Sequence, residues 1–277
     1  MQPPTLADVV AIIEHLYPPN TAQSWDQVGL VTGDPSQPVR HIHCALDPTL
    51  AVIEEARSVG ADLLLTHHPL LMRGVHSVAT TTAKGASVTT LVIADIALYV
   101  AHTNADVAER GVSAALAGLC GLQEVEPLVF EQDRPMGRVG DLAAAVSLAD
   151  FADDLARALP AAPVGVRVSG DPAASVRRVA VSGGAGDTLL AAAREARADV
   201  FVTADLRHHP TIEAREETRG GPPYLIDAGH WASEACWLPL VAADLGVRLG
   251  PDVEVSVSAL CTDPWTFLAG GGSTAPA

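Results

Sequence analysis

The stretch Ala61-Asp-Leu-Leu-Leu-Thr-His67-His68-Pro69-Leu70 decides how the rest of the chain is interpreted. Its three consecutive leucines are typical of a short strand that is buried on both faces of a sheet. Pro69 cannot donate a ladder hydrogen bond, so the strand has to end before it. Open α/β sheets carry their chemistry just beyond the carboxyl ends of their strands. His67 and His68 are therefore candidate metal ligands or acid–base groups, the alternative being a polar pair on a solvated turn.

The composition indicates a folded, acidic protein. Of the 277 residues, 48% are hydrophobic, which is enough for one large core or two medium ones. The formal net charge is -16, and Lys84 is the one lysine of the chain. Such a surface repels polyanions, which argues against nucleic acid as a partner. A small phosphorylated molecule or nucleotide stays compatible with this charge if metals and arginines cluster locally.

Several features predict a cytoplasmic protein without a membrane anchor. No apolar run approaches the ~20 residues that a membrane span needs. The first residues, Met1-Gln-Pro-Pro, lack the basic and apolar regions of a signal peptide. The four cysteines show no C-x-x-C spacing and are expected to be reduced and packed as small hydrophobic side chains: Cys44, Cys120, Cys236 and Cys261.

The opening strand lies in a series of strand–helix–strand units, which are the building block of a parallel or mixed sheet. Thr5 is a suitable N-cap for an amphipathic helix that reaches residue 17. Further helices are predicted at 49–59, 83–95, 111–119, 148–159, 187–197 and 231–245. Further strands are predicted at 41–46, 96–101, 138–147, 176–182, 198–203, 224–227 and 252–260.

An internal repeat predicts an α/β fold with two related lobes. Gly60-Ala-Asp-Leu-Leu-Leu-Thr66 and Arg197-Ala-Asp-Val-Phe-Val-Thr203 match in sequence, and each follows a helix that itself follows a strand. Chance similarity of two aliphatic strands is the alternative. We expect two three-layer lobes with mixed sheets and a metal site between them. The expected ranges are 1–125 for the first lobe, 126–268 for the second, 225–245 packing back to complete the metal site, and 269–277 as a flexible tail.

Histidines and carboxylates recur at three predicted strand ends. They form the patterns His67-His68, His102-x3-Asp106 and His230-x3-Glu234. A spacing of four residues places both members of a pair on one helix face. Four imidazoles and two carboxylates are too many for one tetrahedral ion and suit two, with a bridging carboxylate and open positions for water. The sequence therefore predicts two divalent ions per chain, of Zn, Fe, Mn or Co, and leaves the catalytic residues unknown apart from a metal-bound water.

Five stretches, which follow in order and span most of the chain, carry a family resemblance. They are Trp25-Asp-Gln-Val-Gly-Leu30, Gly60-Ala-Asp-Leu-Leu-Leu-Thr-His-His-Pro69, Ala101-His-Thr-Asn-Ala-Asp106, Thr203-Ala-Asp-Leu-Arg-His-His209 and Asp227-Ala-Gly-His-Trp-Ala-Ser-Glu234. Together they closely resemble the NGG-interacting-factor-like dinuclear metal-centre proteins, often labelled GTP cyclohydrolase 1 type 2 homologues. Ala204 departs from the family, which usually has glycine there, and the short middle segment lacks the domain inserted in some relatives.

The resemblance implies a metal site and an assembly. It implies that the two metals are bound by His67, His68, His102, Asp106, His230 and Glu234. It also implies a toroidal homohexamer whose metal sites face an inner cavity.

Other polar residues near these motifs have two interpretations each. Asp26 could approach the site or close a turn. Asp205, His208 and His209 could support the ligands or bind substrate, or could be exposed residues at the start of a helix. Lys84 and Arg73 could meet a phosphate or lie on a solvated face. The run Gly183-Gly184-Ala185-Gly186 follows a strand but lacks the lysine and hydroxyl residue of a P-loop, so it predicts no nucleotide site.

Two functions fit these patterns. The first is a metal-dependent hydrolase, in which two ions activate water and polarise a carbonyl, imine or phosphoryl group. For this hydrolase the cyclohydrolase label implies attack at C8 of GTP, and a phosphoesterase activity is the other option. The second function is a non-catalytic, metal-binding regulatory or metal-handling oligomer. The same ligands serve both functions, so the sequence leaves this choice open.

Overall fold

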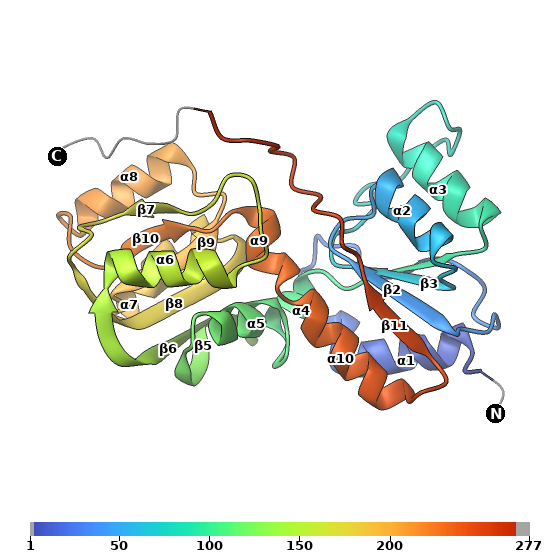
Figure 1. Cartoon of the computed structure of the whole chain (residues 1–277), viewed down its shortest axis with the longest axis horizontal. Coiled ribbons are helices and arrows are strands. Elements are labelled where there is room, and N and C mark those ends of the chain that lie inside the picture. The colour runs from blue at the N-terminus through green and yellow to red at the C-terminus, as the bar shows by residue number, and fades with distance from the viewer. Residues whose placement is uncertain (1–2, 270–277) are drawn as a thin grey trace.

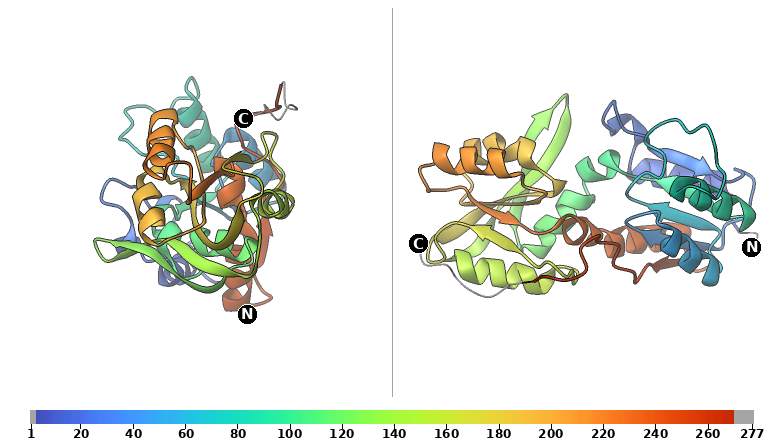
Figure 2. Two further views of the ribbon diagram at one scale, coloured as in Figure 1. Left: turned by 90° about the vertical axis from the view of Figure 1, so that its left-hand side faces the viewer. Right: turned by 90° about the horizontal axis from the view of Figure 1, so that it is seen from above.

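The computed structural model describes residues 3–269 and shows two α/β lobes, each built on a mixed sheet (Figure 1). The first sheet has the strand order β1-β4-β3-β2-β11, and the second has β5-β6-β8-β9-β10-β7. Seen from above, the lobes lie side by side along the long axis of the molecule (Figure 2). The fold class agrees with the prediction. Apart from residue 269, the predicted tail lies outside the described residues.

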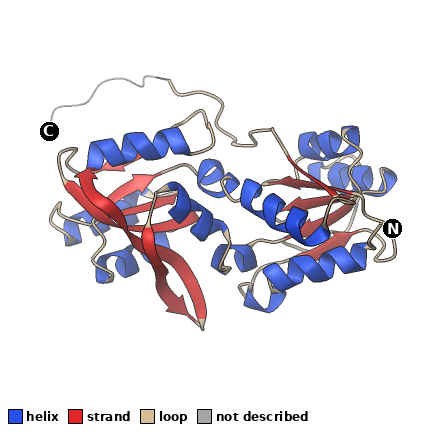
Figure 3. Cartoon of the chain, turned by 60° about the horizontal axis from the view of Figure 1, so that its bottom comes forward, coloured by secondary structure: helices blue, strands red, loops and turns tan. Residues whose placement is uncertain are grey.

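The first lobe has helices on both faces of its sheet, which gives it three layers (Figure 3). Helices α1 and α10 contact each other on one face, and α2 and α3 contact each other on the opposite face (Figure 1). Its strands are β1 (Gly29–Thr32), β2 (His41–Ala45), β3 (Leu63–Thr66), β4 (Ala97–Val100) and β11 (Glu254–Val257). Its helices are α1 (Leu6–Leu16), the 3-10 turn η1 (Pro19–Thr21), α2 (Leu50–Ser58), α3 (Ala83–Ile93) and α10 (Leu238–Leu249).

Strand β3 is buried on both faces, as its leucine run predicts. Leu63 and Leu65 pack into the cluster that includes α1 and α10, while Leu64 packs into the cluster that includes α2. This split follows from the alternation of side chains along a strand. β3 pairs in parallel with β2 and with β4, so the ends of β3 and β4 meet at one edge of the sheet. The residues that follow these strands are thereby placed together.

The second lobe carries the repeat. Its strands are β5 (Gln123–Glu131), β6 (Arg134–Ser147), β7 (Arg167–Ser169), β8 (Ser175–Ala185), β9 (Val200–Ala204) and β10 (Tyr224–Asp227). Its helices are α5 (Val112–Leu119), α6 (Leu148–Ala158), the 3-10 turn η2 (Asp187–Leu189), α7 (Leu190–Glu195) and α8 (His208–Glu217). Two short helices, α4 (Thr103–Val107) and α9 (His230–Ala235), occupy the junction between the lobes (Figure 1). None of the helices in the described part of the chain is long and apolar enough to cross a membrane.

The matching strands β3 and β9 begin in the same way. Asp62 Oδ2 and Asp199 Oδ2 each accept two backbone N–H groups from the neighbouring strand segment. The donors are Arg40 and His41 for Asp62, and Arg177 and Arg178 for Asp199. Each strand is also preceded by a residue with positive φ, Gly60 at 72° and Arg197 at 55°. The repeated Ala-Asp pair therefore has a structural role, which is to fasten the start of a strand to its neighbour.

The chain is divided between the lobes differently from the predicted boundaries of 1–125 and 126–268. Helix α5 packs on β6 and β8, and β5 begins at Gln123, so both belong to the second lobe. In the other direction, α10 and β11 belong to the first lobe, where β11 pairs in parallel with β2. The hydrophobic pattern of residues 252–260 predicts a strand but cannot identify its partner, because that partner lies more than 200 positions away.

Strand β5 is absent from the predicted elements. It is mostly exposed and lies at the edge of the second sheet, paired with β6 alone. An edge strand with two solvated faces lacks the apolar alternation that marks a half-buried strand. Pro127 interrupts the sequence pattern further, because proline is uncommon within strands. The predicted helix at 231–245 is divided into α9 and α10 at Cys236 and Trp237.

Candidate metal centre

All six predicted ligand residues lie together at the junction between the lobes. His67 and His68 follow β3, and His102 follows β4 and precedes α4, which carries Asp106. His230 and Glu234 are the first and fifth residues of α9, which follows β10. Within three overlapping groups, the ligand atoms lie within 4.8 Å of one another: His67, His68 and His102; His68, His230 and Glu234; His67, Asp106 and Glu234. Each of the two sheets thus supplies one side of the centre.

Glu234 lies between two sets of nitrogen ligands. Its Oε1 is 3.7 Å from His67 Nε2, which is also 3.5 Å from Asp106 Oδ1. Its Oε2 is 3.0 Å from His68 Nε2 and 3.1 Å from His230 Nε2. The two oxygens of one carboxylate therefore face different neighbours, which is the arrangement required of a group that bridges two positions.

Each of the four imidazoles is held through Nδ1 by an oxygen that carries no hydrogen. The pairs are His67 with Ala101 O at 2.8 Å, His68 with Asp47 at 2.7 Å, His102 with Asp26 at 2.8 Å and His230 with Asp205 at 2.8 Å. Because a carbonyl or an ionised carboxylate can only accept, each Nδ1 carries the hydrogen. In the neutral rings, every Nε2 lone pair is then free to bind, as in the carboxylate–histidine–metal arrangements of known metal sites.

Three polar atoms of the cluster are buried and form no hydrogen bond within the described chain: His67 Nε2, Asp106 Oδ1 and Glu234 Oε2. A buried polar group left without a partner costs about 1–3 kcal/mol. Here three such atoms, one nitrogen and two carboxylate oxygens, belong to one cluster. Nitrogen and oxygen donors of these kinds are the ligands that divalent transition metals take. The residues present therefore fit a metal ion.

The pKa values show how strongly the cluster attracts positive charge. Burial disfavours the charged form of His68, but the nearby carboxylates of Asp47 and Glu234 outweigh burial and raise its pKa to about 10. The pKa of His230 is raised to about 9 in the same way, against burial, by Glu234 and Asp205. Burial opposes ionisation of Glu234 too, yet His67 and the other facing imidazoles hold its pKa well below the ordinary value. Where protons are held this firmly, a cation can replace them.

A glycine makes room for the Glu234 carboxylate. A Cβ added at Gly184 would lie 2.1 Å from Glu234 Oε1, and the residue has a φ of +63°. Its backbone N–H also donates to Ser233 Oγ at 3.0 Å. Only glycine accommodates both the positive φ and the close approach without strain. The run Gly183-Gly184-Ala185-Gly186 thus shapes the metal centre. Its one sequence signal for this role is the pair of adjacent glycines at the end of a buried strand.

Of the residues with open interpretations, Asp26 and Asp205 belong to the site. Asp26 is buried, orients His102 and accepts hydrogen bonds from the N–H and hydroxyl of Thr103. Asp205 orients His230. Asp47 is an addition that sequence analysis missed, since the segment Asp47-Pro48-Thr49 indicates only a helix cap. Thr49 does cap α2, while Asp47 holds His68 instead.

The other candidates lie away from the centre. His208 and His209 are exposed at the start of α8 and belong to none of the three ligand groups. Lys84 and Arg73 are exposed. Neither of them lines the cleft in front of the metal centre, a cavity of about 680 Å³ that contains His68, His102, Asp106, His230 and Glu234 in its walls. We call this cavity the front cleft.

The fold and the cluster define a two-lobed α/β protein with a candidate dinuclear metal centre at the junction of its lobes. A family model described as Duf34/NIF3 (NGG1p interacting factor 3) matches residues 4–264, and the chain belongs to this family. The family resemblance expected from the five sequence stretches is confirmed.

Similar proteins cover nearly the whole chain. A GTP cyclohydrolase 1 type 2 homolog from Streptomyces coelicolor is 48% identical over 99% of this chain and 98% of its own length. A protein of the same name from Mycobacterium bovis is 34% identical, over 95% of this chain and 97% of its own, in an alignment of 371 positions. Because this chain has 277 residues, the mycobacterial protein carries inserted segments.

Solved structures share the fold. A Bacillus cereus protein related to NIF3 has a TM-score of 0.87 at 24% identity, covering 97% of this chain and all of the other. Reduced HcgD from Methanocaldococcus jannaschii has a TM-score of 0.76 at 30% identity, covering 92% of this chain and 98% of the other.

Proposed function

We propose that this protein is a dinuclear metal-dependent hydrolase. The observation that carries the proposal is the convergence of three buried, unpartnered ligand atoms with four imidazoles whose Nδ1 atoms are all engaged elsewhere. With the rings neutral, hydrogen bonding within residues 3–269 leaves these atoms unsatisfied. Two divalent cations would satisfy them, with Zn, Fe, Mn or Co suited to the donor set.

The residues divide into two groups around Glu234. His67 lies near Oε1 with Asp106 beside it, and His68 and His230 lie near Oε2. His102 shares a ligand group with His67 and His68. We assign Glu234 as the bridging ligand. His67 and His68 would then hold different ions, as their adjacent positions at the end of a strand predict.

The front cleft supplies the place for a substrate. When bound, two cations provide Lewis acidity and lower the pKa of a coordinated water. The cleft adds hydroxyl groups from Thr103, Ser113, Ser182 and Thr188. Among the described residues that line it there is no lysine or arginine, so the hydroxyls orient a substrate by hydrogen bonds and the metal ions meet its negative charge. A carbonyl, imine or phosphoryl centre fits this environment, which is why GTP and phosphoesters are the substrates to test.

One observation favours a second candidate, a non-catalytic metal-binding or metal-handling protein. Apart from the ligand residues themselves, the one ionisable group in the described lining of the front cleft is Glu131, on the β5 edge strand. A hydrolase of this design has little acid–base chemistry of its own and depends on its metals, whereas a metal-handling protein needs no further group.

Turnover separates the two candidates. Purified, metal-loaded protein should be incubated with GTP and with a panel of phosphoesters, using His67→Ala as the control. The hydrolase proposal expects a product that forms with the wild-type chain, is lost on chelation and is absent with His67→Ala. If no substrate yields a metal-dependent product while elemental analysis finds about two metals per chain, the metal-handling function is favoured. Absence of metal under metal-replete conditions would exclude both candidates.

We infer further that the chain forms the toroidal homohexamer implied by its family. The expected mass is six times the 28.6 kDa of one chain. Light scattering coupled to size-exclusion chromatography measures it directly. A monomeric or dimeric mass across the micromolar range would contradict the inference and leave the metal centre unaffected, since all six ligand residues come from one chain.

A further inference from the structure

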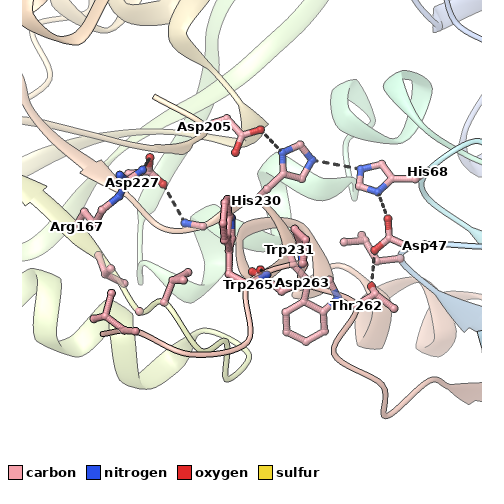
Figure 4. A pocket seen from close by; sticks show the side chains of 17 residues that line it. Asp47, His68, Arg167, Asp205, Asp227, His230, Trp231, Thr262, Asp263 and Trp265 are labelled. Carbon is pink, nitrogen blue, oxygen red and sulfur yellow. Dashed lines mark hydrogen bonds and ion pairs between the residues drawn. The ribbon is translucent and has the colours of Figure 1, made fainter. Parts of the chain in front are cut away.

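A second cavity lies against His68 and His230, and we call it the rear chamber. Its volume is about 610 Å³, and these two histidines are the only described residues that line both it and the front cleft. Their Nε2 atoms are 3.3 Å apart. The two rings therefore form part of a wall between the cavities (Figure 4). A molecule in the rear chamber would contact the same imidazoles as one in the front cleft.

The outer wall of the rear chamber includes part of a segment that we call the strap, residues 258–268. The strap runs from the end of β11 back toward the second lobe (Figure 1). Near its start, Ser258 donates a hydrogen bond to Glu55, and further along Thr262 donates one to Asp47. Because Asp47 also accepts from His68 Nδ1, the strap is connected to the wall between the cavities.

Two indole rings line the rear chamber, those of Trp231 and Trp265 (Figure 4). Trp265 lies on the strap and is 66% exposed. The one hydrogen bond it forms within residues 3–269 is from its backbone N–H to Asp263. An exposed indole that adds little to the packing of the protein offers a broad, rigid face for stacking against another flat ring. Trp265 therefore has the features of a ligand-binding residue.

Arg167 is the one lysine or arginine in the described lining of either cavity. Its side chain is 74% exposed, and its Nη2 lies 2.5 Å from Oδ2 of the buried Asp227, which anchors one arm of the guanidinium (Figure 4). Nε and Nη1 have no hydrogen bond to any residue of the described chain, so part of the guanidinium fork is available to an oxyanion. The carboxylates of Asp47, Asp205 and Asp263 already accept hydrogen bonds from the protein.

We propose that the rear chamber binds a planar aromatic group that carries an oxyanion. The ring stacks on Trp265, and the oxyanion pairs with Arg167. This inference deepens the proposed hydrolase function, because the bound group would be the non-reacting part of the substrate. Only that last statement rests on the hydrolase function. Binding itself requires neither turnover nor a metal, so it can be measured separately.

The test compares a flat ligand with a saturated one. Isothermal titration calorimetry of the full chain, after chelation so that no phosphate binds a cation, should show 1-naphthyl phosphate binding at least tenfold tighter than cyclohexyl phosphate. Trp265→Ala should weaken naphthyl phosphate at least fivefold. Phe267→Ala is the matched control, because Phe267 is an aromatic residue of the same strap, 77% exposed, that does not line the chamber. The Phe267→Ala variant should bind 1-naphthyl phosphate with the affinity of the wild-type chain.

The anion partner has its own variant. Arg167→Gln should weaken 1-naphthyl phosphate about tenfold and leave the neutral 1-naphthol unchanged. If this variant fails to fold, the comparison of Trp265→Ala with Phe267→Ala still tests the proposal. Equal binding of the two phosphates, or equal effects of the two strap substitutions, would overturn the proposal. Failure of every substrate to turn over would remove the hydrolase function but leave this binding result intact.

Discussion

His68 and His230 approach each other to 3.3 Å between their Nε2 atoms, although 162 positions separate them in the chain. Each is held from behind by a carboxylate of its own lobe, Asp47 for His68 and Asp205 for His230. Two imidazoles at this distance cannot both point a hydrogen at the other. Both Nε2 atoms instead face Glu234 Oε2, at 3.0 Å from His68 and 3.1 Å from His230, and a cation that replaced the hydrogens on the two rings would contact all three atoms.

Replacing Glu234 by glutamine should lower the metal content from about two ions per chain to one or fewer. The amide keeps the size of the side chain but loses the charge and one of the two acceptor oxygens that face the two nitrogen groups. Elemental analysis of the purified variant measures the content. Glu131→Gln, in the same cleft but outside the three ligand groups, should keep the wild-type content. Equal metal in both variants would show that Glu234 is not a ligand.

Removing the carboxylate of Asp47 should weaken binding of one ion about 10–100-fold, the usual effect of losing a group that orients a metal-binding histidine. The reason is that His68 loses the 2.7 Å bond that fixes its ring and its tautomer. Competition with a fluorescent chelator measures the affinity of Asp47→Ala. Asp263→Ala is the comparison, since Asp263 lines the rear chamber but has no bond to a ligand residue. An unchanged affinity in Asp47→Ala would remove Asp47 from the site.

Gly184→Ala should disturb the metal centre by collision with Glu234 as well as by backbone strain. Gly121 has a similar φ, +68° against +63°, but no atom lies within 4 Å of the Cβ it would gain. Gly121→Ala therefore measures the strain alone, about 1–3 kcal/mol in the free energy of unfolding. Gly184→Ala should lose more stability and also lose metal. Urea unfolding and elemental analysis of the two variants make the comparison, and equal results in both would mean that the space at Gly184 is unimportant.

Metal binding should release protons at neutral pH. In the metal-free protein the pKa of His68 is about 10 and that of His230 about 9, so both rings are protonated at pH 7.5. A cation needs the lone pair on each Nε2 and must displace these protons. Apparent affinity should consequently rise with pH and level off above about pH 10. Calorimetry in two buffers of different ionisation enthalpy counts the protons; a heat independent of buffer would contradict the prediction.

The raised pKa values also predict the pH dependence of the metal-free fold. A histidine whose pKa is higher in the folded than in the unfolded chain adds stability below its ordinary value of 6.5. That contribution is lost as the pH rises from 6.5 toward 10. Urea unfolding of chelated protein at several pH values should show this decline, and reloading with metal should remove it. A stability that rises over this range would contradict the assignment.

Local sequence patterns were enough to predict which six residues form the cluster, but not the residues that support them. The leucine run of β3 and the four-residue spacing in His102-x3-Asp106 and His230-x3-Glu234 are local signals, and these segments lie where the spacing places them. The bond from His68 to Asp47 spans 21 positions and that from Gly184 to Ser233 spans 49. No periodicity reports such contacts, because they arise only when separate elements meet. The pairing of β11 with β2 was missed for the same reason.

The return of β11 to the first sheet has a consequence for the order in which the protein is made. The first lobe begins with α1 but lacks α10 and an edge strand until residues 238–257 have been synthesised. The strands of the second sheet are complete at Asp227, some 27 residues before β11 begins. Because chains fold progressively as they leave the ribosome, the second lobe can form first while the apolar surface beneath α10 waits for its cover. His230 and Glu234 are added between these two events, so the metal centre is assembled among the last parts of the nascent protein.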